Sequence, residues 1–107
     1  MNDEAVMKSL SDKTRYNIIK LLLMRNYCVG GLARSLNVTE AAISQHIKQL
    51  REAGLVESIR QGYFTHYYVQ RAVLENLALS LLNLITVERI ELQCNPKAPH
   101  TCEHCSN

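Results

Sequence analysis

The stretch from Thr39 to Gly54, TEAAISQHIKQLREAG, constrains the fold of this chain most strongly. Thr39 can cap a first helical turn, because its hydroxyl can accept a hydrogen bond from a free backbone N–H group. Gly54 can close a last turn in the left-handed conformation that other residues resist. Between these ends, Ile43, Ile47 and Leu50 recur at helical spacing. The stretch therefore predicts one helix with two marked ends and a single buried stripe.

The opposite side of this predicted helix is small, polar and partly basic. We call it the outer face, and it consists of Ala41, Ser44, Gln45 and Lys48, with no acidic residue among the four. Ser and Gln side chains can hydrogen-bond to base edges in a DNA major groove, while Lys can contact phosphate. An ordinary amphipathic surface helix would show a similar pattern, so this helix alone favours neither interpretation.

Three further helices are predicted before Thr39. They are expected at Asn2–Leu10, at Lys13 to about Arg25 after a Ser11-Asp12 cap, and at about Val29–Leu36. Asn37 then supplies a residue that tolerates the left-handed conformation. A short helix, a turn of a few residues and a capped helix with a polar outer face is the helix-turn-helix pattern.

The periodicity changes to two after Gly54. Leu55–Arg60 and Phe64–Val69 are rich in β-branched and aromatic residues, and the connection Gln61-Gly62-Tyr63 supplies the glycine that a tight turn needs. A hairpin directly after a helix-turn-helix predicts a winged helix. Arg60 and Gln61 at its tip can touch phosphate or the minor groove, although a solvated turn is an equally good interpretation for Gln61.

The longest predicted helix runs from Arg71 to about Leu92 and carries apolar residues on more than one face. A buried central helix in a monomer would show this pattern, but a chain of this length has too little protein to surround it. We therefore expect a homodimer through the terminal helices. The fold class is mainly α with a small β-hairpin, with a DNA-binding and dimerisation domain at 1–92 and a Cys/His-rich tail at 93–107.

Composition sets broad limits on location and partners. The formal net charge is only +2, but residues 1–70 hold nine Lys and Arg against six Asp and Glu, so any basic surface belongs there. The start, MNDEAVMKSL, lacks a signal-peptide pattern. The apolar run 72–87 is shorter than the roughly 20 residues that span a bilayer. We expect a cytoplasmic protein without a membrane partner, whose four Cys are thiols or metal ligands.

The segment from Leu10 to Val69 resembles the ArsR/SmtB family of metal-responsive repressors. The residues that carry the resemblance are LSDKTRYNIIKLLL and, above all, the phrase SQHIKQLREAGLV. The resemblance implies a homodimeric winged helix that represses its own operon and leaves double-stranded operator DNA when an inducer binds. It also implies base reading by Ala41, Ser44 and Gln45, while Glu40 stands where Gln is often found.

Two inducer sites of that family do not match this sequence. One uses a C-x-C pair at the start of the helix-turn-helix, where Cys28 matches the first Cys but Gly30 replaces the second. The other uses Asp and His on the dimer helix, and the stretch 71–92 contains neither.

The tail contains the remaining metal-binding chemistry. Cys102 and Cys105 have the two-residue spacing that lets both thiolates reach one ion, and Cys94 precedes them, with His100 and His104 nearby. Three thiolates suit a soft ion, with arsenite or antimonite first and cadmium, lead or zinc next. A disordered tail with incidental Cys and a dithiol redox switch are the alternatives.

Three functions are therefore in competition. The first is a DNA-binding repressor released by a soft metal or metalloid, and the second is a repressor of the same fold that responds to thiol oxidation or reactive sulfur. The third is a winged helix for protein contact with a structural zinc tail. No nucleophile–base pair or phosphate loop is present in the sequence, so we do not expect an enzyme.

Overall fold

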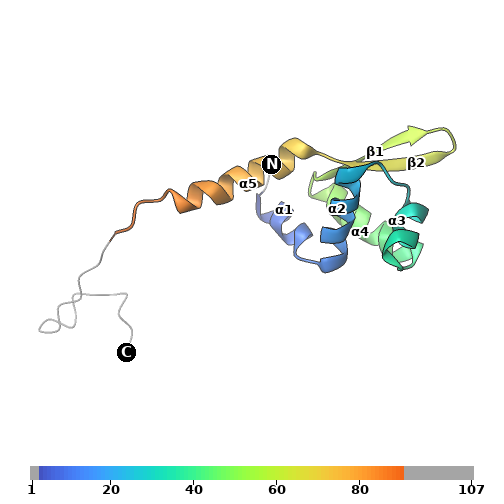
Figure 1. The fold of residues 1–107 in the computed structure, drawn as a ribbon, viewed down its shortest axis with the longest axis horizontal. Coiled ribbons are helices and arrows are strands. Elements are labelled where there is room, and N and C mark those ends of the chain that lie inside the picture. The colour runs from blue at the N-terminus through green and yellow to red at the C-terminus, as the bar shows by residue number, and fades with distance from the viewer. Residues whose placement is uncertain (1–2, 91–107) are drawn as a thin grey trace, which may run out of the picture.

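A computed structural model describes residues 3–90, which form helices and one antiparallel hairpin (Figure 1). This arrangement confirms the expected class, mainly α with a small β-hairpin. The elements are α1 (Asp3–Leu10), α2 (Lys13–Met24), α3 (Val29–Leu36), α4 (Glu40–Glu52), β1 (Val56–Gln61), β2 (Phe64–Val69) and α5 (Arg71–Ile85).

Side-chain caps fix where α2 and α4 begin. The Asp12 carboxylate accepts a hydrogen bond from the Arg15 backbone N–H at 3.1 Å. The Thr39 hydroxyl accepts one from the Ala42 backbone N–H, also at 3.1 Å. Each cap satisfies one of the four N–H groups that a helix start leaves without an internal partner. Both caps were predicted, and both are confirmed.

The turn between α3 and α4 depends on a left-handed residue. Asn37 has a φ of 56°, and its backbone N–H donates to the Ala33 carbonyl. Asn adopts this conformation more readily than most residues with a Cβ atom. The chain therefore reverses within Asn37–Thr39 and enters α4, as the helix-turn-helix pattern predicts.

The end of α4 explains a small error in the predicted hairpin. Gly54 adopts a φ of 80°, and the Leu55 backbone N–H donates to the Leu50 carbonyl at 3.0 Å. This 6→1 bond is typical of a glycine-terminated helix, so Leu55 belongs to the helix end and not to the strand. The strand therefore begins at Val56, one residue later than predicted.

The hairpin turn is also shorter than predicted. Val56 pairs with Val69, and Gln61 pairs with Phe64, so only Gly62 and Tyr63 form the turn. Gly62 has a φ of 65°, which a two-residue hairpin turn requires and which L side chains resist. Gln61 therefore belongs to the last pair of the ladder and not to the connection.

The core lies where α1, α2, α3, α4 and the base of the hairpin meet. The three predicted stripe residues of α4 are all buried, each no more than 3% exposed. The largest fully buried side chains come from five different parts of the chain: Val6, Ile18, Leu32, Ile43, Leu50, Leu55 and Val56. This single cluster fixes the orientation of α4.

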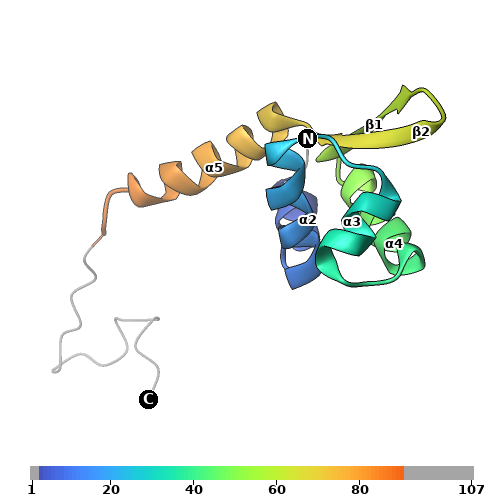
Figure 2. The ribbon, with the colours of Figure 1, turned by 45° about the vertical axis from the view of Figure 1, so that its right-hand side comes forward.

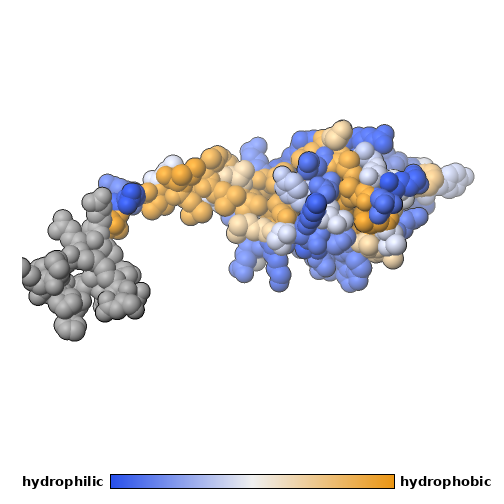
Figure 3. Space-filling view, turned by 60° about the horizontal axis from the view of Figure 1, so that its bottom comes forward, coloured by the Kyte–Doolittle hydropathy of each residue, from blue (hydrophilic) through white to orange (hydrophobic). Residues whose placement is uncertain are grey.

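Helix α5 leaves this core and projects away from it (Figures 1 and 3). Val73 and Leu77 are buried near its start, whereas the apolar residues farther along are exposed. The exposed set is Leu79, Leu81, Leu82, Leu84, Ile85, Val87 and Ile90. Residues 3–90 include no helix that is long and apolar enough to cross a membrane.

The predicted end of the last helix at Leu92 is wrong, because α5 ends at Ile85. The Thr86 hydroxyl donates to the Asn83 carbonyl at 2.7 Å, and its backbone N–H donates to the same carbonyl. A threonine side chain that bonds the preceding turn competes with helix continuation. Apolar spacing alone could not show this, since Val87 and Ile90 continue the pattern.

We predict that Asp12→Ala lowers the free energy of unfolding by about 1 kcal/mol at pH 7. The hydrogen bond from the Arg15 N–H holds the pKa of the Asp12 carboxyl below its ordinary value of 3.8. A lowered pKa stabilises the fold above the unfolded value, and this contribution is lost as the pH falls through the folded value. Urea unfolding should therefore show a smaller difference in the free energy of unfolding between the parent and Asp12→Ala at pH 3 than at pH 7.

Asp12→Asn is the matched control, since Asn retains an acceptor oxygen for the Arg15 N–H but has no charge to titrate. At pH 7 its free energy of unfolding should lie between those of the parent and Asp12→Ala, and its difference from Asp12→Ala should not change with pH. A gap for Asp12→Ala that stayed constant down to pH 3 would contradict the ionic cap.

Candidate nucleic-acid interface

The outer face of α4 is exposed along its whole length. Ala41, Ser44, Gln45 and Lys48 are each exposed, on the side of the helix opposite the buried stripe. Figure 2 shows α3 and α4 side by side, on the side of the body away from α5. The structure thus brings four of the six predicted DNA-binding residues together on one surface.

An open groove of about 490 Å³ runs beside this face and separates α4 from the hairpin. Ser44 and Lys48 line it from α4, and Tyr67 lines it from β2. Arg51 also lines it, but its guanidinium lies 3.7 Å from the Glu57 carboxylate. Within residues 3–90 Lys48 forms no such ion pair, and Glu52 also lines the groove.

The remaining two predicted residues lie at the hairpin tip, which is the wing. Arg60 and Gln61 are both exposed, and the Arg60 Nε donates to the Gly62 carbonyl at 3.4 Å. This bond folds the guanidinium back over the turn. The hairpin that carries them projects from the helical body as a separate arm (Figure 1).

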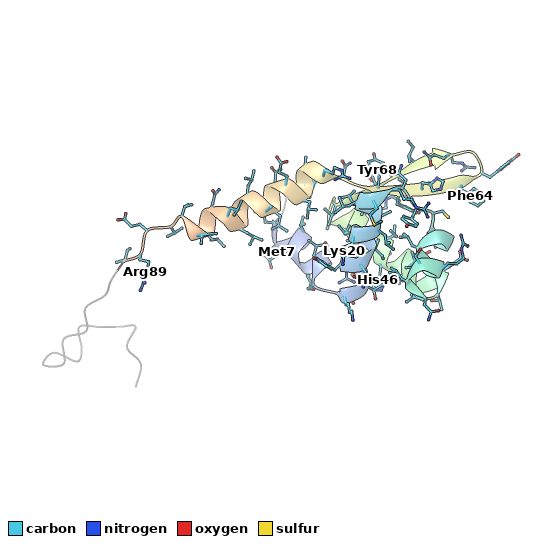
Figure 4. The ribbon with its side chains drawn as sticks, viewed as in Figure 1. Met7, Lys20, His46, Phe64, Tyr68 and Arg89 are labelled. Carbon is cyan, nitrogen blue, oxygen red and sulfur yellow. The ribbon has the colours of Figure 1, made fainter. Side chains whose placement is uncertain are left out.

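Sequence reasoning missed two aromatic residues at the same tip. Tyr63 is 96% exposed and Phe64 is 63% exposed, which is unusual for aromatic side chains. Figure 4 labels Phe64 near the end of the wing. Gly62 could have revealed the exposure of Tyr63 from the sequence. A glycine at the first position of a two-residue turn places the next residue, Tyr63, at the second position.

The predicted metal ligands Cys94, His100, Cys102, His104 and Cys105 lie outside the residues that the structure describes. Among residues 3–90, no group of three or more His, Cys, Asp or Glu side chains is arranged to hold a metal ion. The tail therefore remains a prediction from sequence.

Cys28 has a structural role that the sequence did not reveal. It is half-buried, and its Sγ accepts a hydrogen bond from the Gly31 backbone N–H at 3.4 Å, so it caps α3. Gly30 occupies the position of the missing second Cys, and a Cβ atom there would lie 3.3 Å from the Arg34 guanidinium. The C-x-C site is therefore replaced by a cap and a closely approached glycine.

His66 lies near Cys28, in a groove of about 650 Å³ between α3 and the wing. Its Nδ1 atom is buried and lacks a hydrogen-bond partner among the described residues. His46, by contrast, has its Nδ1 atom 3.2 Å from an Arg15 guanidinium nitrogen. Among residues 3–90, neither histidine belongs to a group of three or more side chains that could hold a metal ion.

Comparison with known proteins identifies the class of this helix-turn-helix. The family described as "bacterial regulatory protein, arsR family" matches residues 12–58. Transcriptional repressor SdpR of Bacillus subtilis (strain 168) is 32% identical over 80 residues, which span 75% of this chain and 89% of that protein. The chain belongs to the ArsR family. This family consists of DNA-binding transcriptional regulators, so the chain is a repressor-type regulator and not an enzyme.

Two further similarities support the same membership. The arsenical resistance operon repressor of Escherichia coli (strain K12) is 38% identical over 63 residues, 58% of this chain and 54% of that protein. An ArsR-like transcriptional regulator from Rhodococcus sp. RHA1 superimposes with a TM-score of 0.73 at 32% identity, over 78% of this chain and 79% of that one. The chain thus spans only about half the length of the arsenical relative.

Proposed function

We propose that this ArsR-family regulator is a homodimeric repressor of operator DNA in the cytoplasm, and that a soft metal or metalloid at the tail cysteines releases it. The observation that carries the DNA-binding part is the acid-free outer face of α4, held outward by the buried stripe on its other side.

We expect the outer-face side chains to contact the bases and the phosphates of the operator according to their hydrogen-bonding groups and charge. Gln45 and Ser44 can hydrogen-bond to base edges in the major groove, and the small Ala41 lets the start of α4 approach the bases. Lys48 would contact phosphate beside the groove. The wing would lie over the adjacent backbone or minor groove, where Arg60 and Gln61 supply donors.

We predict that Gln45→Ala lowers discrimination at one base pair by about 1–3 kcal/mol. Lys48→Ala should weaken binding to all sequences alike and reduce the slope of log affinity against log salt by about 0.9, because one phosphate contact is lost. Gel retardation with operator and scrambled DNA at several salt concentrations measures both effects.

Lys20→Ala is the charge-matched control for Lys48→Ala, because Lys20 is an exposed lysine that lies on α2 and not on the reading helix α4 (Figure 4). It should bind like the parent. If Gln45→Ala and Lys48→Ala also bound like the parent, α4 would not be the reading helix.

The dimer is supported by the apolar part of α5. Leu81, Leu82 and Ile85 are each about half exposed or more, and Met7 on α1 is 44% exposed. A soluble protein rarely leaves so continuous an apolar surface uncovered. A second copy of the chain, packing α5 and α1 against their counterparts, would cover it and set two reading helices about 34 Å apart on successive major grooves.

We predict that the parent is a dimer at micromolar concentration and that Leu81→Lys shifts it to monomer or aggregate, since a charge would be buried in the seam. Sedimentation velocity measures the change. Asn76→Lys adds the same charge at an exposed polar position of α5 and should remain dimeric. A monomeric parent under these conditions would contradict the proposed seam.

The inducer site is supported by ligand chemistry and by one relative. Cys94, Cys102 and Cys105 offer three thiolates, which suit a pyramidal trivalent ion such as arsenite or antimonite, while His104 or His100 could complete a site for cadmium, lead or zinc. The Escherichia coli relative is named as an arsenical resistance repressor. Because α5 ends at Ile85, an ion held by the tail would act on the dimer through the connector that follows α5.

We predict that reduced protein on operator DNA is released by one of these ions, with a coupling of about 1–3 kcal/mol between ion and DNA. Thiolate–metal absorbance should appear at the same ion concentration as release. Both should weaken as the pH falls, because protons compete for the thiolates. The measurement is an anaerobic titration followed by absorbance and DNA anisotropy together.

Cys102→Ser and Cys105→Ser should abolish release, and Cys28→Ser, which changes a cysteine outside the tail, should retain it. Release of both tail variants at the parental ion concentration would exclude the tail as the sensor. Release of DNA by an oxidant in metal-free buffer would instead establish the thiol-redox alternative. Failure of the parent protein to bind any DNA would favour the alternative of a protein-binding winged helix with a structural zinc tail.

A further inference from the structure

The Arg15 side chain joins three helices through hydrogen bonds. It extends from the first turn of α2, where its backbone N–H donates to the Asp12 cap. Its Nε donates to the Ser9 carbonyl in the last turn of α1 at 2.6 Å. Its Nη1 lies 3.2 Å from the Nδ1 atom of His46 on α4. Since a guanidinium can only donate, this contact is a hydrogen bond in the tautomer whose Nδ1 is unprotonated and accepts.

These partners are fixed parts of the fold. Ser9 is buried, and its own hydroxyl donates to the Val6 carbonyl at 2.7 Å. His46 follows the outer-face residue Gln45 and precedes the buried Ile47. A guanidinium is a rigid planar fork, so two fixed acceptors on different helices define the distance and the angle between those helices.

Helix α1 is in turn attached to α5. The Ser80 hydroxyl donates to the Asp3 carboxylate at 2.7 Å, and the two helices pack together. Arg15 therefore stands between the α1–α5 pair, which carries the proposed dimer seam, and the reading helix α4. In Figure 4, Met7 marks α1 and His46 marks α4.

We propose that Arg15 is a positioning residue that holds the reading helix at a fixed angle to α1 and α5 through His46, without touching DNA itself. The inference rests on the proposed DNA-reading function. Both side-chain contacts of the Arg15 guanidinium are to protein acceptors, the Ser9 carbonyl and the His46 ring.

The first test measures operator affinity across salt concentrations for Arg15→Gln, His46→Ala and the double variant. Each single variant should lose about tenfold in affinity, as expected for a lost hydrogen bond to a charged group. The double variant should bind operator no more weakly than the weaker-binding of the two single variants, because Arg15→Gln and His46→Ala remove the same linkage. The salt slope should equal that of the parent, because no phosphate contact is lost.

Two further variants separate positioning from charge. Arg15→Lys retains the charge but cannot donate from two fork nitrogens at once, so it should lose as much affinity as Arg15→Gln. Lys13→Gln removes a charge from an exposed residue in the same turn of α2 and should change affinity less than twofold. Three outcomes would overturn the proposal and indicate a direct phosphate contact. They are parental affinity in Arg15→Lys, a salt slope reduced by about 0.9 in Arg15→Gln, and affinity losses that add in the double variant.

A measurement on the free protein tests the positioning role of Arg15 separately from the proposed DNA binding. In the free protein, Arg15→Gln should shift the backbone amide resonances of α4 around His46 and of the end of α1, while Lys13→Gln should leave them in place. Unchanged α4 resonances in folded Arg15→Gln protein would overturn the positioning role even if the parent binds DNA. If the parent bound no DNA, the proposed function would fail, and the amide shifts would still decide the role of Arg15.

Discussion

Burial of one stripe of α4 is the constraint on which the rest of the structure depends. Ile43, Ile47 and Leu50 are removed from water, so rotation of the helix about its axis would expose apolar surface at about 25 cal/mol per Å². The same rotation would bring Gln45 and Lys48 into the core without partners. The stripe therefore fixes which side chains face outward, and the surface that could meet DNA is a consequence of packing.

Helix α5 presents the opposite situation. Val73 and Leu77 bury the start of the helix against its own subunit, and then the core ends while the apolar pattern continues. A helix that is apolar beyond its own domain needs another surface. One helix thus has two tasks at different positions along its length: attachment of the subunit core near Val73, and the proposed seam from Leu81 onward.

The sequence predicts the helix-turn-helix closely because its determinants are local. Thr39 and Asn37 specify a cap and a left-handed turn whatever surrounds them, and α3 has the predicted bounds. The errors occur where a local hydrogen bond that apolar spacing does not reveal ends a helix. The Leu55 backbone N–H donates to the Leu50 carbonyl of α4, and Thr86 donates to the Asn83 carbonyl of α5. The outer face was predictable from spacing, whereas the Arg15 linkage requires three helices to be placed in space.

The tertiary linkage also bears on how an inducer could act. Cys28 is the free cysteine of the described residues, and its sulfur caps α3, so this body offers no set of thiolates to a soft ion. An ion held by the tail would lie beyond α5 in the sequence, and its effect would first reach α5. From Ser80 that effect can pass to α1, and from the end of α1 through Arg15 to α4, in steps of one hydrogen bond each. A shift at the proposed α5 seam would therefore change the angle of the reading helix α4. That angle matters for binding, because the two reading helices of a dimer must match the spacing of the operator half-sites.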